Sequence, residues 1–129
     1  MKKLVLSVLF ALLPAGGALA QSYSFEVPKA VVTVRVGRDG SALIHYAITF
    51  HCMPGAHAVD VVDIGMPHMG GGHQPVGAAI DGRPISAGQI RTSTFLKPRG
   101  CGYEVHLGAN AIRPGNTGVF EFTGRERNM

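Results

Sequence analysis

Alternating apolar and polar side chains form the clearest pattern in this chain. Two such runs, 31–36 and 42–52, flank the dipeptide Asp39-Gly40. A period of two places alternate side chains on opposite faces of a strand, so one face suits a core and the other suits water. Asp-Gly is a turn signal, because glycine accepts a positive φ without a Cβ clash. The pattern predicts a long β-hairpin. The core-facing positions of its first arm are Val32, Val34 and Val36.

Shorter runs of the same kind follow, separated by Gly, Pro, Asn and Asp. They cover residues 59–64, 76–80, 83–85, 90–96, 103–107 and 119–123. Helical periodicity is not evident beyond the first twenty residues. About seven or eight short strands with turns between them favour an all-β fold. We therefore predict a small antiparallel β-sandwich of immunoglobulin-like character, with a glycine-rich loop over residues 66–74.

The first twenty residues predict export. Lys2 and Lys3 precede an apolar run from Leu4 to Leu13, and Ala18-Leu19-Ala20 forms a small-x-small cleavage site. These are the parts of a secretory signal peptide. The apolar run is shorter than the ~20 residues that a membrane-spanning helix needs. We expect a signal peptide at 1–20, a β-sandwich domain at 21–129, and a periplasmic or extracellular product.

The charge balance argues against a nucleic-acid partner. Removing Lys2 and Lys3 lowers the count of Lys and Arg from 12 to 10 against 8 acidic residues, so the net charge falls from +4 to +2. The remaining basic residues are scattered along the chain and form no basic block or face with interleaved aromatic residues. A nucleic-acid-binding domain would be expected to concentrate them.

Two cysteines, Cys52 and Cys101, remain after cleavage. An even count in an exported chain favours a disulfide. Closing a loop of about fifty residues would stabilise the domain by roughly 4 kcal/mol on the chain-entropy model. The alternative is a pair of buried free thiols.

One loop combines soft and borderline metal ligands. Thioether and imidazole groups together suit Cu(I), and imidazole alone suits Cu(II) or Zn(II). The candidate ligands are Met66, His68, Met69 and His73. Their spacing matches no zinc motif, and methionine at a strand end commonly fills gaps in a core. A copper-binding loop is therefore an alternative hypothesis beside a purely structural one.

We predict no catalytic residues and no enzymatic activity. The chain lacks the G-x-S-x-G elbow of a serine hydrolase. Asp60 and Asp63 differ in strand parity, so they do not form an acid–base pair on one face. Apart from copper in the alternative hypothesis, we expect no cofactor.

A family resemblance adds to this picture. Val31 to Phe50 reads as a strand, an Asp-Gly-Ser turn and a strand ending in Ile48-Thr49-Phe50. The segments 54–57, 59–65, 81–85 and 105–108 continue the likeness. The pattern resembles the N-terminal exported module of predicted bacterial membrane proteins that carry domain of unknown function 2207. The resemblance implies an exported β-rich architecture followed by a membrane span, and it implies no activity. The Met- and His-rich loop is not part of that pattern.

The combined hypothesis is a non-catalytic exported β-sandwich with an interaction or structural role in the cell envelope. Its partner is an unidentified protein or other envelope component. The last predicted strand runs into residues 125–129 without a closing element. This end is consistent with a polar tail or with a chain that continues past Met129, and only the second version would bring membrane attachment.

Overall fold

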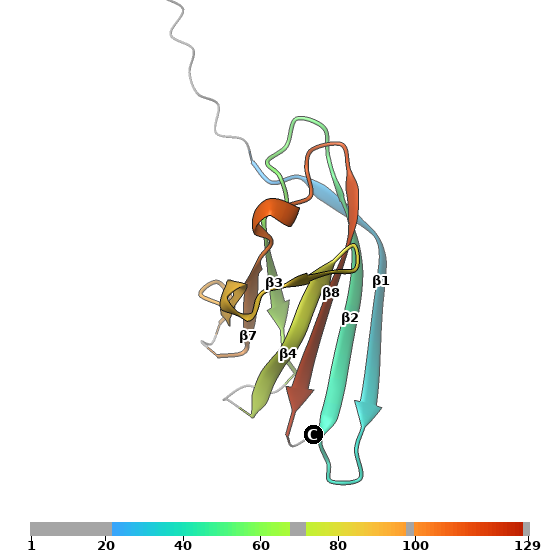
Figure 1. The fold of residues 1–129 in the computed structure, drawn as a ribbon, viewed down its shortest axis with the longest axis vertical. Coiled ribbons are helices and arrows are strands. Elements are labelled where there is room, and N and C mark those ends of the chain that lie inside the picture. The colour runs from blue at the N-terminus through green and yellow to red at the C-terminus, as the bar shows by residue number, and fades with distance from the viewer. Residues whose placement is uncertain (1–21, 68–71, 98–99, 128–129) are drawn as a thin grey trace, which may run out of the picture.

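The computed structural model describes residues 22–67, 72–97 and 100–127. Their strands form two antiparallel sheets packed face to face (Figure 1). The larger sheet has the order β1-β2-β8-β4-β5, and the smaller has the order β3-β7-β6. The predicted antiparallel β-sandwich is confirmed.

The strands and the two short 3-10 helices follow one another closely along the chain. Their bounds are β1 Phe25–Val36, β2 Ala42–Cys52, β3 Val61–Gly65, β4 His73–Ile80, β5 Arg83–Ile85, η1 Ala87–Gln89, β6 Ile90–Thr92, β7 Gly102–His106, η2 Gly108–Asn110 and β8 Thr117–Glu126. Among the described residues, the structure has no helix with the length and apolar character needed to cross a membrane.

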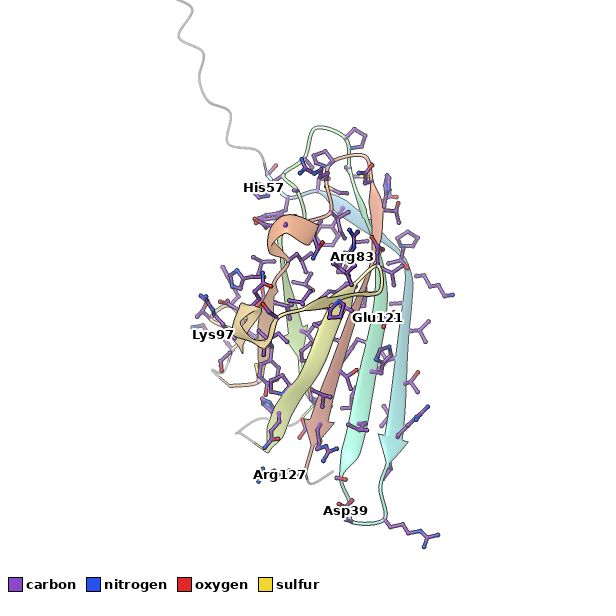
Figure 2. The ribbon with its side chains drawn as sticks, viewed as in Figure 1. Asp39, His57, Arg83, Lys97, Glu121 and Arg127 are labelled. Atoms are coloured by element: carbon purple, nitrogen blue, oxygen red, sulfur yellow. The ribbon has the colours of Figure 1, made fainter. Side chains whose placement is uncertain are left out.

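The hairpin predicted around Asp39-Gly40 is present as β1 and β2. Val36 faces Ala42 across its closed end. Gly40 has φ of 82°, and Asp39 Oδ1 accepts hydrogen bonds from the backbone N–H and the hydroxyl of Ser41 at 3.0 and 2.6 Å. Figure 2 shows Asp39 at the tip of this hairpin. The turn chemistry read from the sequence therefore fixes the register of the two longest strands.

β1 begins earlier than the alternation predicted. In the ladder Glu26 faces His51 and Lys29 faces Thr49. Two residues of β1, Val27 and Pro28, therefore lie opposite one residue of β2, which is a β-bulge. A bulge tolerates proline because its extra residue has no ladder partner, so Pro28 does not end the strand.

The core lies under β2, β8 and β4, where the smaller sheet covers them. Phe120 and Phe122 of β8 are fully buried, and Val105 of β7 meets them from the other sheet as a fully buried residue. The rings of Tyr103 and Phe122 lie 5.7 Å apart between centroids. Burying side chains of this size stabilises a fold by roughly 1.5–3 kcal/mol each, so this central layer is the main source of stability.

Two strand ends differ from the prediction. β6 stops at Thr92 because the Ser93 hydroxyl oxygen accepts the N–H groups of Phe95 and Leu96, which turns the chain. β8 continues to Glu126, whose side chain is buried in phase with Phe122. Side-chain hydrogen bonding and burial at a strand end, rather than the apolar pattern, set these limits.

The structure does not show the predicted Cys52–Cys101 disulfide, and both residues are free cysteines in it. The Cys52 N–H donates to the Asn116 carbonyl at 2.9 Å, just before β8 begins. The Cys101 carbonyl accepts from the Met66 N–H at 2.7 Å, and the Met66 side chain lies over Gly124 near the other end of β8. Roughly 20 Å of strand separates these two ends. A disulfide requires Cα atoms within about 7 Å.

Candidate functional site

The inner face of β1 is apolar and uncovered. Register pairs Val32 with Tyr46, Val34 with Ile44 and Val36 with Ala42, so these valines share the face that β2 turns to the core. They are nevertheless 54, 48 and 68% exposed. These valines are exposed because the smaller sheet has three strands and does not extend over β1 (Figure 1). The predicted core face exists, and nothing in the described chain covers it.

An apolar groove of about 650 Å³ lies beside the start of β1. Phe25 and Phe50 form one wall, with ring centroids 5.4 Å apart in an edge-to-face arrangement, and Val62 of β3 forms part of the other. Phe95, 75% exposed, stands at its rim. The groove and the inner face of β1 meet at Phe25, so they form one apolar surface, which we call the β1 surface.

Tyr23 borders this groove at the N-terminal side. Its hydroxyl donates to Asp60 Oδ1 at 2.6 Å, and its ring lies against that of His57 at a centroid distance of 4.6 Å. The hydrogen bond to Asp60 raises the pKa of Tyr23 above its ordinary value of 10.0. At neutral pH the phenol is therefore a neutral donor that holds the chain entering β1 in place.

Acidic side chains line the other side of the groove. Asp63 and Glu104 face each other on neighbouring strands β3 and β7. The Ser93 hydroxyl donates to Asp63 at 2.5 Å, and His106 Nε2 lies 3.2 Å from Glu104 Oε1. The hydrogen bond from His106 lowers the pKa of Glu104 below its ordinary value of 4.5. Each carboxylate thus has a neighbour that holds it in place beside the groove.

The predicted copper ligands are only partly brought together. Met66 is buried in the core, where its Cε and Sδ occupy the space that a Cβ at Gly124 would need. His73 Nδ1 lies 2.6 Å from the Tyr103 hydroxyl, and His73 Nε2 lies 2.5 Å from the Gly100 carbonyl oxygen. His68 and Met69 lie outside the described residues. Met66 and His73 would have to give up these contacts to bind an ion, and copper binding here stays a prediction.

His73 belongs instead to a polar cluster at the hairpin-turn end of the sandwich. Tyr103 contacts it edge-on, with ring centroids 5.2 Å apart, and Glu126 faces His73 across the β4–β8 ladder. Burial, with the charge of Glu126 adding to it, raises the pKa of Tyr103 and of Tyr46. This cluster was not predicted from the sequence. The available signal was Glu126 itself, which is in phase with Phe120 and Phe122.

Within the described ranges, no group of three or more His, Cys, Asp or Glu side chains is arranged to hold a metal ion. The acidic side of the groove and the polar cluster at the hairpin-turn end both fall short of such a group. The uncovered β1 surface is therefore the most distinctive feature of the described residues.

Comparison with known proteins gives a fold and no family. No known protein family and no curated protein matches the chain. A solved M1 zinc metallopeptidase mutant from Deinococcus radiodurans, bound to a Tyr-Ser-Ala substrate, is similar over 79% of this chain with 16% identity and a TM-score of 0.51. A two-domain M1 zinc metallopeptidase mutant bound to L-tryptophan is similar over 82%, also with 16% identity, at 0.52.

This chain spans only about a fifth of each of those structures, 20% and 21%. At this level of identity the likeness establishes a shared β-sandwich fold and nothing about activity.

Proposed function

We propose that this chain is a non-catalytic, exported β-sandwich domain that acts in the cell envelope by protein contact through the β1 surface. The observation that carries the proposal is the exposure of a largely apolar strand along its whole length. All twelve residues of β1 are exposed, although one of its faces repeats valine at every second position. Contiguous exposed apolar surface on a small domain is typical of an interaction site.

The groove supports contact rather than chemistry. Its walls are aromatic and branched aliphatic side chains, a composition that suits the apolar anchors of a protein partner. The nearby ionisable groups Asp63, Glu104 and His106 are held by hydrogen bonds to structural neighbours or to one another. This arrangement favours a fixed surface that a partner covers.

The site of action rests on the first twenty residues. Lys2, Lys3 and the apolar run that follows them support export, and the resemblance to exported membrane-protein modules supports a place in the envelope. Mass analysis of the protein from a periplasmic fraction tests this part. We expect a chain that starts at Gln21, whereas a full-length chain confined to the cytoplasm would contradict export.

Site-specific photo-crosslinking tests the contact surface in the exported protein. A benzophenone side chain is placed at Val34 on the inner face of β1, and as a matched control at Val76, which is equally apolar and 58% exposed on β4. We expect irradiation to give one discrete heavier species from position 34 and none from position 76. Equal or absent crosslinking at both positions would overturn the proposal.

A further inference from the structure

We infer that β1 pairs with β1 of a second copy of this chain, antiparallel and centred on Val31, so that one continuous sheet runs through both molecules. This inference rests on the proposed function, because it names the partner that covers β1. β1 is an edge strand of the larger sheet, with no described strand beyond it (Figure 1). An edge strand presents a row of backbone N–H and C=O groups that a second strand can pair with.

Length distinguishes β1 from the other sheet edges. β1 has twelve residues, whereas β5 and β6 have three each and β3 has five. Short edge strands are one way in which proteins prevent pairing between molecules. β1 lacks that protection, and its residues 30–36 carry four valines with a single charge, Arg35.

The bulge in β1 places two opposite charges on one face. Glu26 faces His51 and Arg35 faces Leu43 across the ladder, and these two residues of β2 point to the same side of the sheet. Without the bulge, Glu26 and Arg35 would lie on opposite faces. Within the described chain neither side chain forms an ion pair. Both are exposed near opposite ends of the strand.

Self-pairing centred on Val31 uses these charges. Centring the pair on Val31 places Thr33 opposite Lys29 of the second copy and Val32 opposite its Ala30. Antiparallel partners that lie opposite each other point to the same face of the sheet. Beyond that point the bulge shifts the pairing by one residue. Arg35 then faces Glu26 of the second copy, and the two-fold axis repeats this ion pair at the other end.

The same register joins apolar groups on the inner face. Val36 faces Phe25 of the second copy, at the point where the groove begins, and the inner-face valines of the two copies lie side by side. Pro28 lies in the bulge, where no ladder hydrogen bond is required of it. The features that discourage pairing in other registers, Pro28 and the bulge, are therefore compatible with this one.

Charge exchange in the processed, exported protein tests the register. Glu26→Arg gives a chain with two positive charges at these positions, and Arg35→Glu gives a chain with two negative charges. We expect the wild-type chain to dimerise in analytical ultracentrifugation, and each single variant to have a dimer dissociation constant at least ~10-fold higher, since like charges then face each other. An equimolar mixture of the two variants should dimerise again, because both ion pairs reform.

The double variant Glu26→Arg with Arg35→Glu should also dimerise, because both of its ion pairs are restored in reverse. Arg83→Glu on β5, an exposed charge reversal at the other edge of the same sheet, is the matched control and should leave dimerisation unchanged. Circular dichroism checks that every variant is folded.

A wild-type chain that stays monomeric, or single variants that dimerise as well as wild type, would overturn the inference. A monomeric chain that still gives a discrete crosslink from position 34 to another protein would leave the proposed function in place with a different partner. A chain with neither property would contradict both.

Discussion

At the scale of single residues, close approach between strands is the most sensitive feature. Gly65 and Gly102 face each other across β3 and β7, yet they differ in the space around them. A Cβ at Gly102 would overlap the Ile64 carbonyl oxygen, whereas a Cβ at Gly65 would meet nothing within 4 Å. We expect Gly102→Ala to lower the free energy of unfolding by ~1–3 kcal/mol. Gly65→Ala, the matched control, should change it by less than about 0.5 kcal/mol.

Urea unfolding of the two glycine variants, followed by circular dichroism, measures this difference. Both variants make the same chemical change in the same pair of strands, so a general effect of alanine on strand entropy would alter them alike. Equal destabilisation would show that the backbone of β3 can move away from β7, and it would contradict the tight approach at Ile64.

Tyr103 gives a pH dependence whose direction follows from its environment. Burial, with the charge of Glu126 adding to it, raises the pKa of Tyr103 above its ordinary value of 10.0. The folded protein therefore holds this proton more tightly than the unfolded chain does. Its contribution to stability is complete below about pH 10 and is lost as the pH rises through the folded-state pKa.

We expect Tyr103→Phe to flatten the alkaline fall in unfolding free energy, as measured by urea titrations between about pH 8 and about pH 11. The variant should also lose about 1 kcal/mol at neutral pH, because the hydroxyl no longer contacts His73 Nδ1. Burial and the charge of Glu126 also raise the pKa of Tyr46, which is unchanged in this variant. Part of the alkaline fall in unfolding free energy should therefore persist. An alkaline slope identical to that of wild type would contradict this account.

At the scale of elements, strand position decides the state of the two cysteines. Cys52 ends β2 and is fully buried, whereas Cys101 precedes β7 and is partly exposed. We expect N-ethylmaleimide, without reductant, to label Cys101 in the folded protein and Cys52 only after unfolding in urea. Intact-mass analysis counts the adducts. Labelling that requires a reductant would restore the predicted disulfide and contradict the strand arrangement.

The sequence predicted elements where local chemistry is sufficient to specify them. Asp39 and Gly40 define the hairpin turn, and alternation from Ala42 to Cys52 defines β2 to within its observed bounds. The early start of β1 was missed because proline suits a strand start, an edge or a bulge, and the bulge that accommodates Pro28 inside β1 depends on pairing with β2. The structure does not show the predicted disulfide for a related reason, since cysteine counts carry no information on which strand ends adjoin.

At the scale of the whole molecule, periodicity predicts which side chains share a face but not what covers that face. Val32 and Ile44 repeat the same alternation and lie on the same side of the larger sheet. Ile44 is buried under the smaller sheet, while Val32 is exposed beyond it. The difference depends on the number of strands in the second sheet. The candidate site therefore arises from an imbalance between the two layers, which no local pattern encodes.

This imbalance between the layers predicts that replacing valine by threonine destabilises the protein at a buried position but not on β1. Replacing valine by threonine keeps the shape and adds a hydroxyl, which is costly only where water is excluded. In dilute protein, the double variant Val34→Thr with Val36→Thr should change the unfolding free energy by less than ~0.5 kcal/mol. Val105→Thr, at a fully buried position of β7, should lower it by ~1–3 kcal/mol. The β1 double variant, unlike Val105→Thr, should also bind less of a dye that is specific for exposed apolar surface. A loss of stability in the β1 variant as large as that of Val105→Thr would mean that the inner face of β1 is covered within a single molecule, and the imbalance between the layers would not exist.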